Sequence, residues 1–72
     1  MKEQYKLGEQ IKKLRIKEGM KRQELSMLSM VNYTTLMNIE NGKSNPTLKT
    51  LHRLAIFLGV NMKELFDYDT KD

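Results

Sequence analysis

The 72-residue sequence contains no cysteine and no tryptophan, and it has only one histidine and one proline. Without cysteine, neither a disulfide nor a thiolate metal site can stabilise the fold. His52 alone cannot supply a set of metal ligands, and its place on an expected helix favours an ordinary surface side chain. The serines have no catalytic base at a recognisable spacing, and there is no glycine-rich phosphate loop. We therefore expect no enzyme activity, no metal and no cofactor.

Long apolar segments are also missing. The longest purely apolar run extends from Leu54 to Leu58, far short of the roughly 18 residues that a membrane span needs. The Met1 end has no apolar signal-peptide region, because it carries the polar residues Lys2, Glu3, Gln4 and Lys6. These features predict a cytoplasmic protein with no membrane partner.

The net charge of +4 is distributed unevenly along the chain. Residues 1–43 hold nine Lys or Arg against five Glu, whereas residues 44–72 hold four charges of each sign. A basic half beside a neutral half is typical of a protein that binds a polyanion such as nucleic acid. From charge alone, a lysine-rich surface that promotes solubility explains the pattern equally well.

Glycine and proline divide the chain into five expected helices. Leu7, Ile11 and Leu14 form one apolar stripe, and Gly19 then supplies a left-handed helix end. Gly42 and Gly59 end later helices, and Asn45-Pro46 predicts a turn. The expected ranges of the first three helices are Gln4 to Glu18, Arg22 to Ser29 and Tyr33 to Glu40. The fourth helix is expected to be capped by Thr47 and to run to Leu58, and the fifth to be opened by the capping-box spacing of Asn61 and Glu64 and to run through Leu65 and Phe66.

The expected core follows from the same periodicity. The third helix is capped by Asn32 and turns Leu36 and Ile39 inward. The inward stripe of the fourth helix comprises Leu48, Leu51, Leu54, Ala55 and Leu58. Because no alternating apolar pattern is present, no strand is expected. The prediction is one all-α domain over residues 1–72, with a core unit at 7–66 and a frayed tail at 67–72.

Residues 20–42 contain two short expected helices joined by a tight turn, the spacing of a DNA-binding helix-turn-helix. From Leu7 to Phe66 the chain resembles the Cro and phage-repressor family of helix-turn-helix regulators, also called xenobiotic-response-element-like (XRE) regulators. This resemblance implies a small five-helix bundle. The segments that carry it are Leu7-Gly8-Glu9-Gln10-Ile11, Leu14-Arg15, Gly19, Glu24-Leu25, Ile39-Glu40-Asn41-Gly42-Lys43, Asn45-Pro46-Thr47-Leu48, Leu54-Ala55, Leu58-Gly59-Val60 and Glu64-Leu65-Phe66.

The resemblance implies roles for individual residues. Arg15 and Glu40 match a structural salt bridge. The positions that face bases are Tyr33, Thr34, Met37 and Asn38, and those that contact phosphate are Arg22, Gln23, Thr35, Asn41 and Lys43. Independently of the family, asparagine can pair bidentately with adenine, and threonine offers a methyl group to thymine. The simpler alternative for each is an exposed polar side chain on a short helix.

Two departures from the family pattern stand out. Lys21 and Arg22 replace the small polar cap and the glutamine that usually open the second helix, and the glutamine follows as Gln23. A weaker N-cap and a more ionic phosphate contact are expected. Met30 occupies a turn position that is often glycine, so a positive φ there would cost about 1 kcal/mol.

The resemblance implies a sequence-specific, double-stranded DNA-binding transcriptional regulator, most simply a repressor that binds an inverted repeat as a homodimer. The expected dimer interface comprises Phe57, Val60, Met62 and Phe66, whereas Leu65 belongs to the core. No small-molecule ligand is expected, so control would come from concentration, a partner protein or proteolysis. The alternative is a protein-interaction module, such as an antitoxin or a coactivator bridge. Its sequence signal is apolar bulk on expected surfaces at Met27, Met30 and Met37.

Overall fold

The computed structural model describes residues 2–68, and these residues form five helices and no strand. The helices are α1 (Lys2–Lys17), α2 (Arg22–Ser29), α3 (Tyr33–Glu40), α4 (Leu48–Leu58) and α5 (Met62–Leu65). The expected all-α bundle is confirmed, and the bounds of α2, α3 and α4 agree with the sequence analysis. The expected tail at 67–72 lies largely outside the described residues.

The ends of α1 and α5 differ from the expected ones. α1 begins at Lys2 rather than Gln4 and ends at Lys17 rather than Glu18, and α5 ends at Leu65. Glu3 lies in the first turn of α1, where a carboxylate is stabilised by the positive end of the helix dipole. At the other end, the Gly19 N–H donates to the Ile16 carbonyl (2.9 Å) and the Met20 N–H to the Arg15 carbonyl (3.1 Å). These two bonds close the helix, with Gly19 in the left-handed region (φ 72°).

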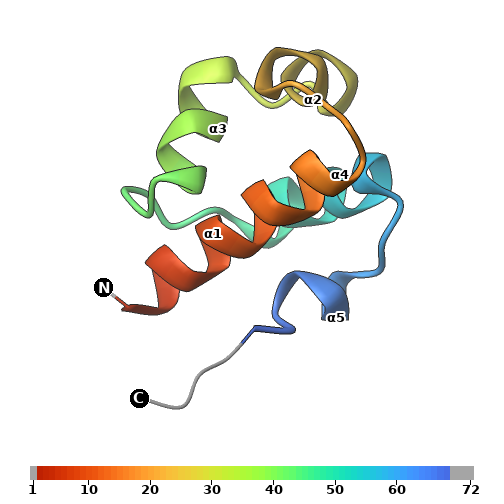
Figure 1. Ribbon diagram of the computed structural model, residues 1–72. Helices are drawn as coiled ribbons and strands as arrows, with labels where there is room; N and C mark the ends of the chain where they lie inside the picture. Colours follow the sequence, from red (N-terminus) through yellow and green to blue (C-terminus); the bar gives the residue numbers. More distant parts are fainter. Residues whose placement is uncertain (1, 69–72) are drawn as a thin grey trace.

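The helices pack in pairs around one apolar core (Figure 1). α1 lies against α3 and α5, whereas α2 lies against α3 and α4. The core comprises Leu7, Ile11, Leu25, Val31, Leu36, Ile39, Leu51, Leu54, Ala55, Leu58 and Leu65. Every helix therefore contributes at least one buried side chain, and burial of these side chains is the main force holding α2 and α3 in place.

Leu48 was expected in this core, and that prediction is wrong, because 73% of its surface is exposed. It is the first residue of α4, directly after the N-cap Thr47. An apolar stripe indicates which side of a helix faces the core, but not how far along the helix a neighbour covers that side. Leu28, near the end of α2, is also exposed (51%).

α1 and the end of α3 approach each other closely at Gly8. A Cβ atom at this position would overlap the carbonyl oxygen of Ile39 and lie 3.0 Å from that of Glu40. Only glycine can occupy this contact without moving one of the two helices. Gly8 thereby sets the distance between α1 and α3.

Candidate nucleic-acid interface

The turn between α2 and α3 is fixed by two serine hydroxyls. Ser26 Oγ donates to the Val31 carbonyl (2.6 Å) and Ser29 Oγ donates to the Leu25 carbonyl (2.6 Å). Ser29 Oγ also accepts from the Val31 N–H (3.3 Å). Since the Val31 side chain is buried as well, the turn is held by both packing and hydrogen bonds. α2 and α3 therefore keep a fixed relative orientation.

Met30 makes the sharp change of direction at the end of α2. Its φ of 61° lies in the left-handed region, and it is the only non-glycine residue with a positive φ among residues 2–68. Its side chain is 80% exposed, so packing does not offset the strain of about 1–2 kcal/mol that this conformation costs. The strain expected from the sequence is therefore present.

α3 begins with an N-cap and presents one polar side to solvent. The Oδ1 atom of Asn32 accepts from the backbone N–H groups of Thr34 (2.9 Å) and Thr35 (3.3 Å). The buried side carries Leu36, Ile39 and Glu40. The helical repeat places Thr34 and Asn38 opposite these residues, and Tyr33 and Met37 along the edge nearer to Glu40. Tyr33 and Thr34 are exposed, and Met37 and Asn38 are half-buried.

The other candidate phosphate-binding residues flank this side. Thr35 and Gln23 are exposed in the first turns of α3 and α2. Asn41 and Lys43 follow α3 and are exposed, and the Lys43 N–H donates to the Asn38 carbonyl (2.8 Å). This bond fixes the backbone of Lys43 beside the last turn of α3.

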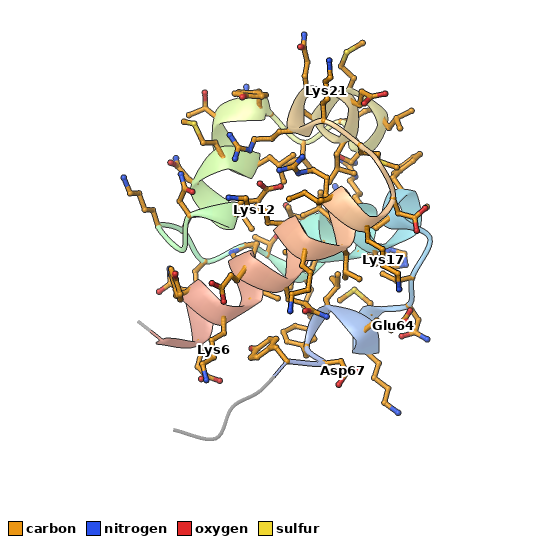
Figure 2. The ribbon with its side chains drawn as sticks, in the orientation of Figure 1. Lys6, Lys12, Lys17, Lys21, Glu64 and Asp67 are labelled. Carbon is orange, nitrogen blue, oxygen red and sulfur yellow. The ribbon has the colours of Figure 1, made fainter. Side chains whose placement is uncertain are left out.

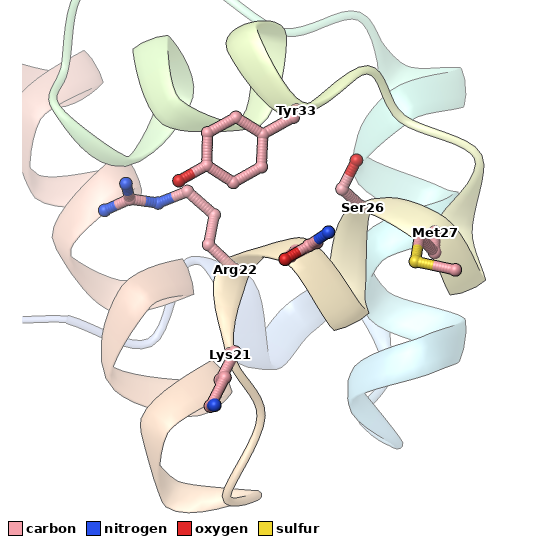
Figure 3. A pocket seen from close by; sticks show the side chains of 6 residues that line it. Lys21, Arg22, Ser26, Met27 and Tyr33 are labelled. Atoms are coloured by element: carbon pink, nitrogen blue, oxygen red, sulfur yellow. The ribbon is translucent and has the colours of Figure 1, made fainter.

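The start of α2 borders an open concavity of about 580 Å³ next to α3 (Figure 3). Its lining residues are Lys21, Arg22, Gln23, Ser26, Met27 and Tyr33. The Lys21 N–H donates to Glu24 Oε1 (2.9 Å), but the Lys21 side chain makes no capping hydrogen bond within the described part of α2. The weaker N-cap expected from the sequence is confirmed. The sequence analysis did not single out Ser26 as part of this surface.

Figure 2 shows where several charged side chains lie on the molecule. Lys21 lies at the end that carries α2 and α3, whereas Glu64 and Asp67 lie at the opposite end, where Asp67 lies near Lys6 of α1. The excess of positive charge in the first half of the sequence comes mainly from α1 and its neighbours, because residues 1–19 hold six Lys or Arg against three Glu.

Glu40 binds two arginines in the interior behind α3. Arg15 Nε donates to Glu40 Oε2 (2.7 Å), and Arg15 Nη2 donates to Oε1 (3.1 Å). Arg22 Nε also donates to Oε1 (3.1 Å). The Glu40 side chain has no exposed surface, and those of Arg15 and Arg22 are 8% and 23% exposed. The pair named from the sequence, Arg15 and Glu40, is therefore one part of a three-residue network.

Arg22 extends this network to the candidate base-facing side. Its guanidinium carbon lies 5.9 Å from the centroid of the Tyr33 ring, within the range of a cation–π interaction. Partial burial opposes the charged form, but Tyr33 and Glu40 outweigh it and raise the pKa of Arg22 above its usual value. Sequence reasoning missed both partners, because spacings of 18 and 11 residues carry no periodic signal.

The expected dimer residues do not form a uniform surface. Phe57 (39% exposed) and Phe66 (46% exposed) present apolar area to solvent, and Ile56, which was not named from the sequence, is 55% exposed. Val60 and Met62 pack against the core. Leu65 is fully buried, as expected.

Known proteins share both the sequence pattern and the geometry. Residues 11–65 match the family described as Helix-turn-helix. The HTH-type transcriptional regulator DdrOP3 of Deinococcus deserti is 29% identical over 62 residues, which are 86% of this chain but only 48% of that protein. The ImmF control region 10 kDa protein of Bacillus phage phi105 is 37% identical over 83% of this chain and 67% of its own length.

Comparison with solved structures also finds a relative of the same fold. The restriction-modification controller protein C.AhdI from Aeromonas hydrophila superposes with a TM-score of 0.90 at 27% identity, covering 92% of this chain and all of that chain. This chain belongs to the helix-turn-helix family of DNA-binding transcriptional regulators, of the XRE type. None of the helices in the described part of the chain has the length and apolar character that a membrane crossing requires.

Proposed function

We propose that this protein is a sequence-specific repressor that binds an inverted-repeat operator in double-stranded DNA as a homodimer. The observation that carries the proposal is the fixed helix-turn-helix, whose α3 leaves Tyr33 and Thr34 exposed and Met37 and Asn38 half-buried, while Leu36 and Ile39 face the core. We place the protein in the cytoplasm, where such an operator is accessible.

In this proposal, α3 enters the major groove and reads bases with its outer side. The Asn38 side chain would pair with an adenine edge, and Thr34 would offer its methyl group to thymine. Arg22, Gln23, Thr35, Asn41 and Lys43 flank that side and would contact the backbone. Phosphate contacts position the protein and supply most of the affinity, whereas base contacts supply the specificity.

A dimer is proposed because one helix reads only a few base pairs, and a single small module makes few contacts. The apolar area of Phe57 and Phe66 lies in the half of the chain that carries no net charge, so charge does not oppose contact with a second copy. A two-fold arrangement places two recognition helices in successive major grooves about 34 Å apart. Bound in this way, the dimer would block access of polymerase to the promoter.

Selection of duplexes from a random pool with the purified chain tests this proposal. We expect an inverted repeat with half-site centres roughly 10 base pairs apart and two chains bound per selected site. Recovery of no consensus sequence would contradict the reading of bases. One chain that saturates a single half-site, with no gain from a second half-site, would contradict the dimer.

A second candidate function, binding of a partner protein, is favoured by the exposure of Met27 (72%) and Met30 (80%) at the end of α2. Met37 is half-buried, so the three methionines do not form the uniformly exposed surface expected from the sequence. Copurification of a stoichiometric partner that Met27→Ser and Met30→Ser together remove would support this function.

A further inference from the structure

We propose that Arg22 is a positioning residue that sets the base preference of Tyr33, because it joins the buried carboxylate of Glu40 to the Tyr33 ring. This inference rests on the proposed reading of DNA by α3 and adds a determinant to it. This positioning role differs from a simple phosphate contact, for which Arg22 would need only its positive charge.

The inner end of Arg22 is held by a group that cannot move away. Glu40 is the last residue of α3, its side chain has no exposed surface, and Arg15 already binds both of its oxygens. The 3.1 Å bond from Arg22 Nε to Oε1 therefore anchors the guanidinium to a fixed point.

The outer part of Arg22 lies near the Tyr33 ring, whose orientation it can fix. Tyr33 is the first residue of α3, and 44% of its surface is exposed. The Asn32 cap fixes the backbone of this turn, but it leaves the aromatic ring free to rotate about its side-chain bonds. The Arg22 side chain extends past the hydroxyl end of the ring, as Figure 3 shows, with the guanidinium carbon 5.9 Å from the ring centroid. Arg22 therefore restricts the directions in which Tyr33 can point into the groove.

Arginine and lysine differ in how well they can perform this role. A planar guanidinium can donate from Nε to a carboxylate while its face lies against an aromatic ring, whereas an ammonium is a single point of charge on a flexible stem. Arg22→Lys thus keeps the charge that a phosphate contact needs and removes the link between Glu40 and Tyr33. This difference separates the two roles.

The test measures binding of four proteins to the selected operator and to duplexes changed at each base pair: wild type, Arg22→Lys, Tyr33→Ala and the double variant. Tyr33→Ala should lower the preference at one base pair. Arg22→Lys should lower the preference at the same base pair by about fivefold or more, the size expected for coupled neighbours. In the double variant, Tyr33→Ala should then change that preference little.

Lys21→Gln is the matched control, because it removes a cation from the same concavity. It should weaken binding to all duplexes alike and reduce the salt slope by about one. If Arg22→Lys retains the wild-type preference at every base pair, the proposal is wrong and Arg22 acts as a charge alone. A second measurement needs no variant: proton NMR of the free wild-type protein should give contacts between the Arg22 side chain and the Tyr33 ring, and their absence would also overturn the proposal. Failure of the wild type to select any sequence would instead overturn the proposed function itself.

Discussion

Arg15 Nε lies 2.7 Å from Oε2 of Glu40, so a charge from the last turn of α1 meets one from the last turn of α3 inside the protein. Arg15 also donates from Nη1 to the Met20 carbonyl (2.8 Å), which lies just before α2. One side chain thus contacts α1, the α1–α2 connection and α3. The pair forms a structural junction behind the helix-turn-helix, and its burial makes both residues poor candidates for base contact.

The first prediction concerns this junction. Arg15→Ala should lower the free energy of unfolding by about 3–5 kcal/mol, because it leaves Glu40 buried without its main partner. Lys12→Ala is the control, since Lys12 is exposed on the same helix and its loss should cost less than about 0.5 kcal/mol. Urea unfolding of both variants measures the difference. Equal stabilities would show that the pair contributes nothing.

The second prediction concerns the contact at Gly8. Gly8→Ala should destabilise the protein by about 1–3 kcal/mol, because the added methyl group would press on the Ile39 carbonyl. Gly19→Ala adds a methyl group to open space and suffers only from its positive φ, at about 1 kcal/mol. In thermal unfolding, Gly8→Ala should have a lower melting temperature than Gly19→Ala. Stabilisation by Gly8→Ala, as helix propensity alone predicts, would contradict the close approach of α1 and α3.

The third prediction concerns the strain at Met30. Met30→Gly should raise the free energy of unfolding by about 0.5 kcal/mol, because relief of the left-handed backbone exceeds the added flexibility of the unfolded chain. Met27→Gly, at an exposed site inside α2, should instead lower it by about 1 kcal/mol. In urea unfolding, the midpoint concentrations of the two variants should therefore shift in opposite directions from that of the wild type.

The fourth prediction separates base contacts from phosphate contacts. Asn38→Ala should cost about 1–3 kcal/mol on the selected site and relax the preference at one base pair. Lys43→Ala should weaken binding to all duplexes alike and reduce the log–log salt slope by about one. Titrations on selected and scrambled duplexes at several salt concentrations distinguish the two. An equal loss on both duplexes for Asn38→Ala would reject its assigned role.

The fifth prediction concerns the dimer. Phe66→Glu should reduce affinity for the complete inverted repeat about tenfold or more and leave binding to a single half-site unchanged. Ile16→Glu introduces the same charge at an exposed apolar residue of α1 (58% exposed) and serves as the control. Gel shifts on one and two half-sites provide the readout. The same loss for both variants would place the interface elsewhere.

The sequence was sufficient to predict the fold because its local signals agree with one another. Asn32 and Thr47 cap α3 and α4, and the left-handed Gly42 and Gly59 follow them. Apolar residues at helical spacing then identify the buried sides, as for Leu36 and Ile39. Such signals act over a few residues, so one sequence is enough to detect them.

The features that could not be predicted from the sequence depend on contacts between residues far apart along the chain. Leu48 continues the stripe of α4 but lies where no neighbour covers it. Arg22 is a polar residue at the start of α2, and its link to Glu40 and Tyr33 exists only once α2 and α3 are packed together. A sequence pattern indicates the direction of a side chain, whereas tertiary structure determines what it meets.

The outer side of α3 contributes few interactions to the fold, and this affects how its sequence can evolve. Within residues 2–68, the side chains of Thr34, Met37 and Asn38 take part in no hydrogen bond or ion pair, whereas the buried side is fixed by Leu36, Ile39 and Glu40. Substitutions at these three residues therefore carry little stability cost. If these residues read bases as proposed, a duplicated gene could acquire a new operator preference through them without loss of folding, and the proposed role of Arg22 would tie a change at Tyr33 to a change at Arg22.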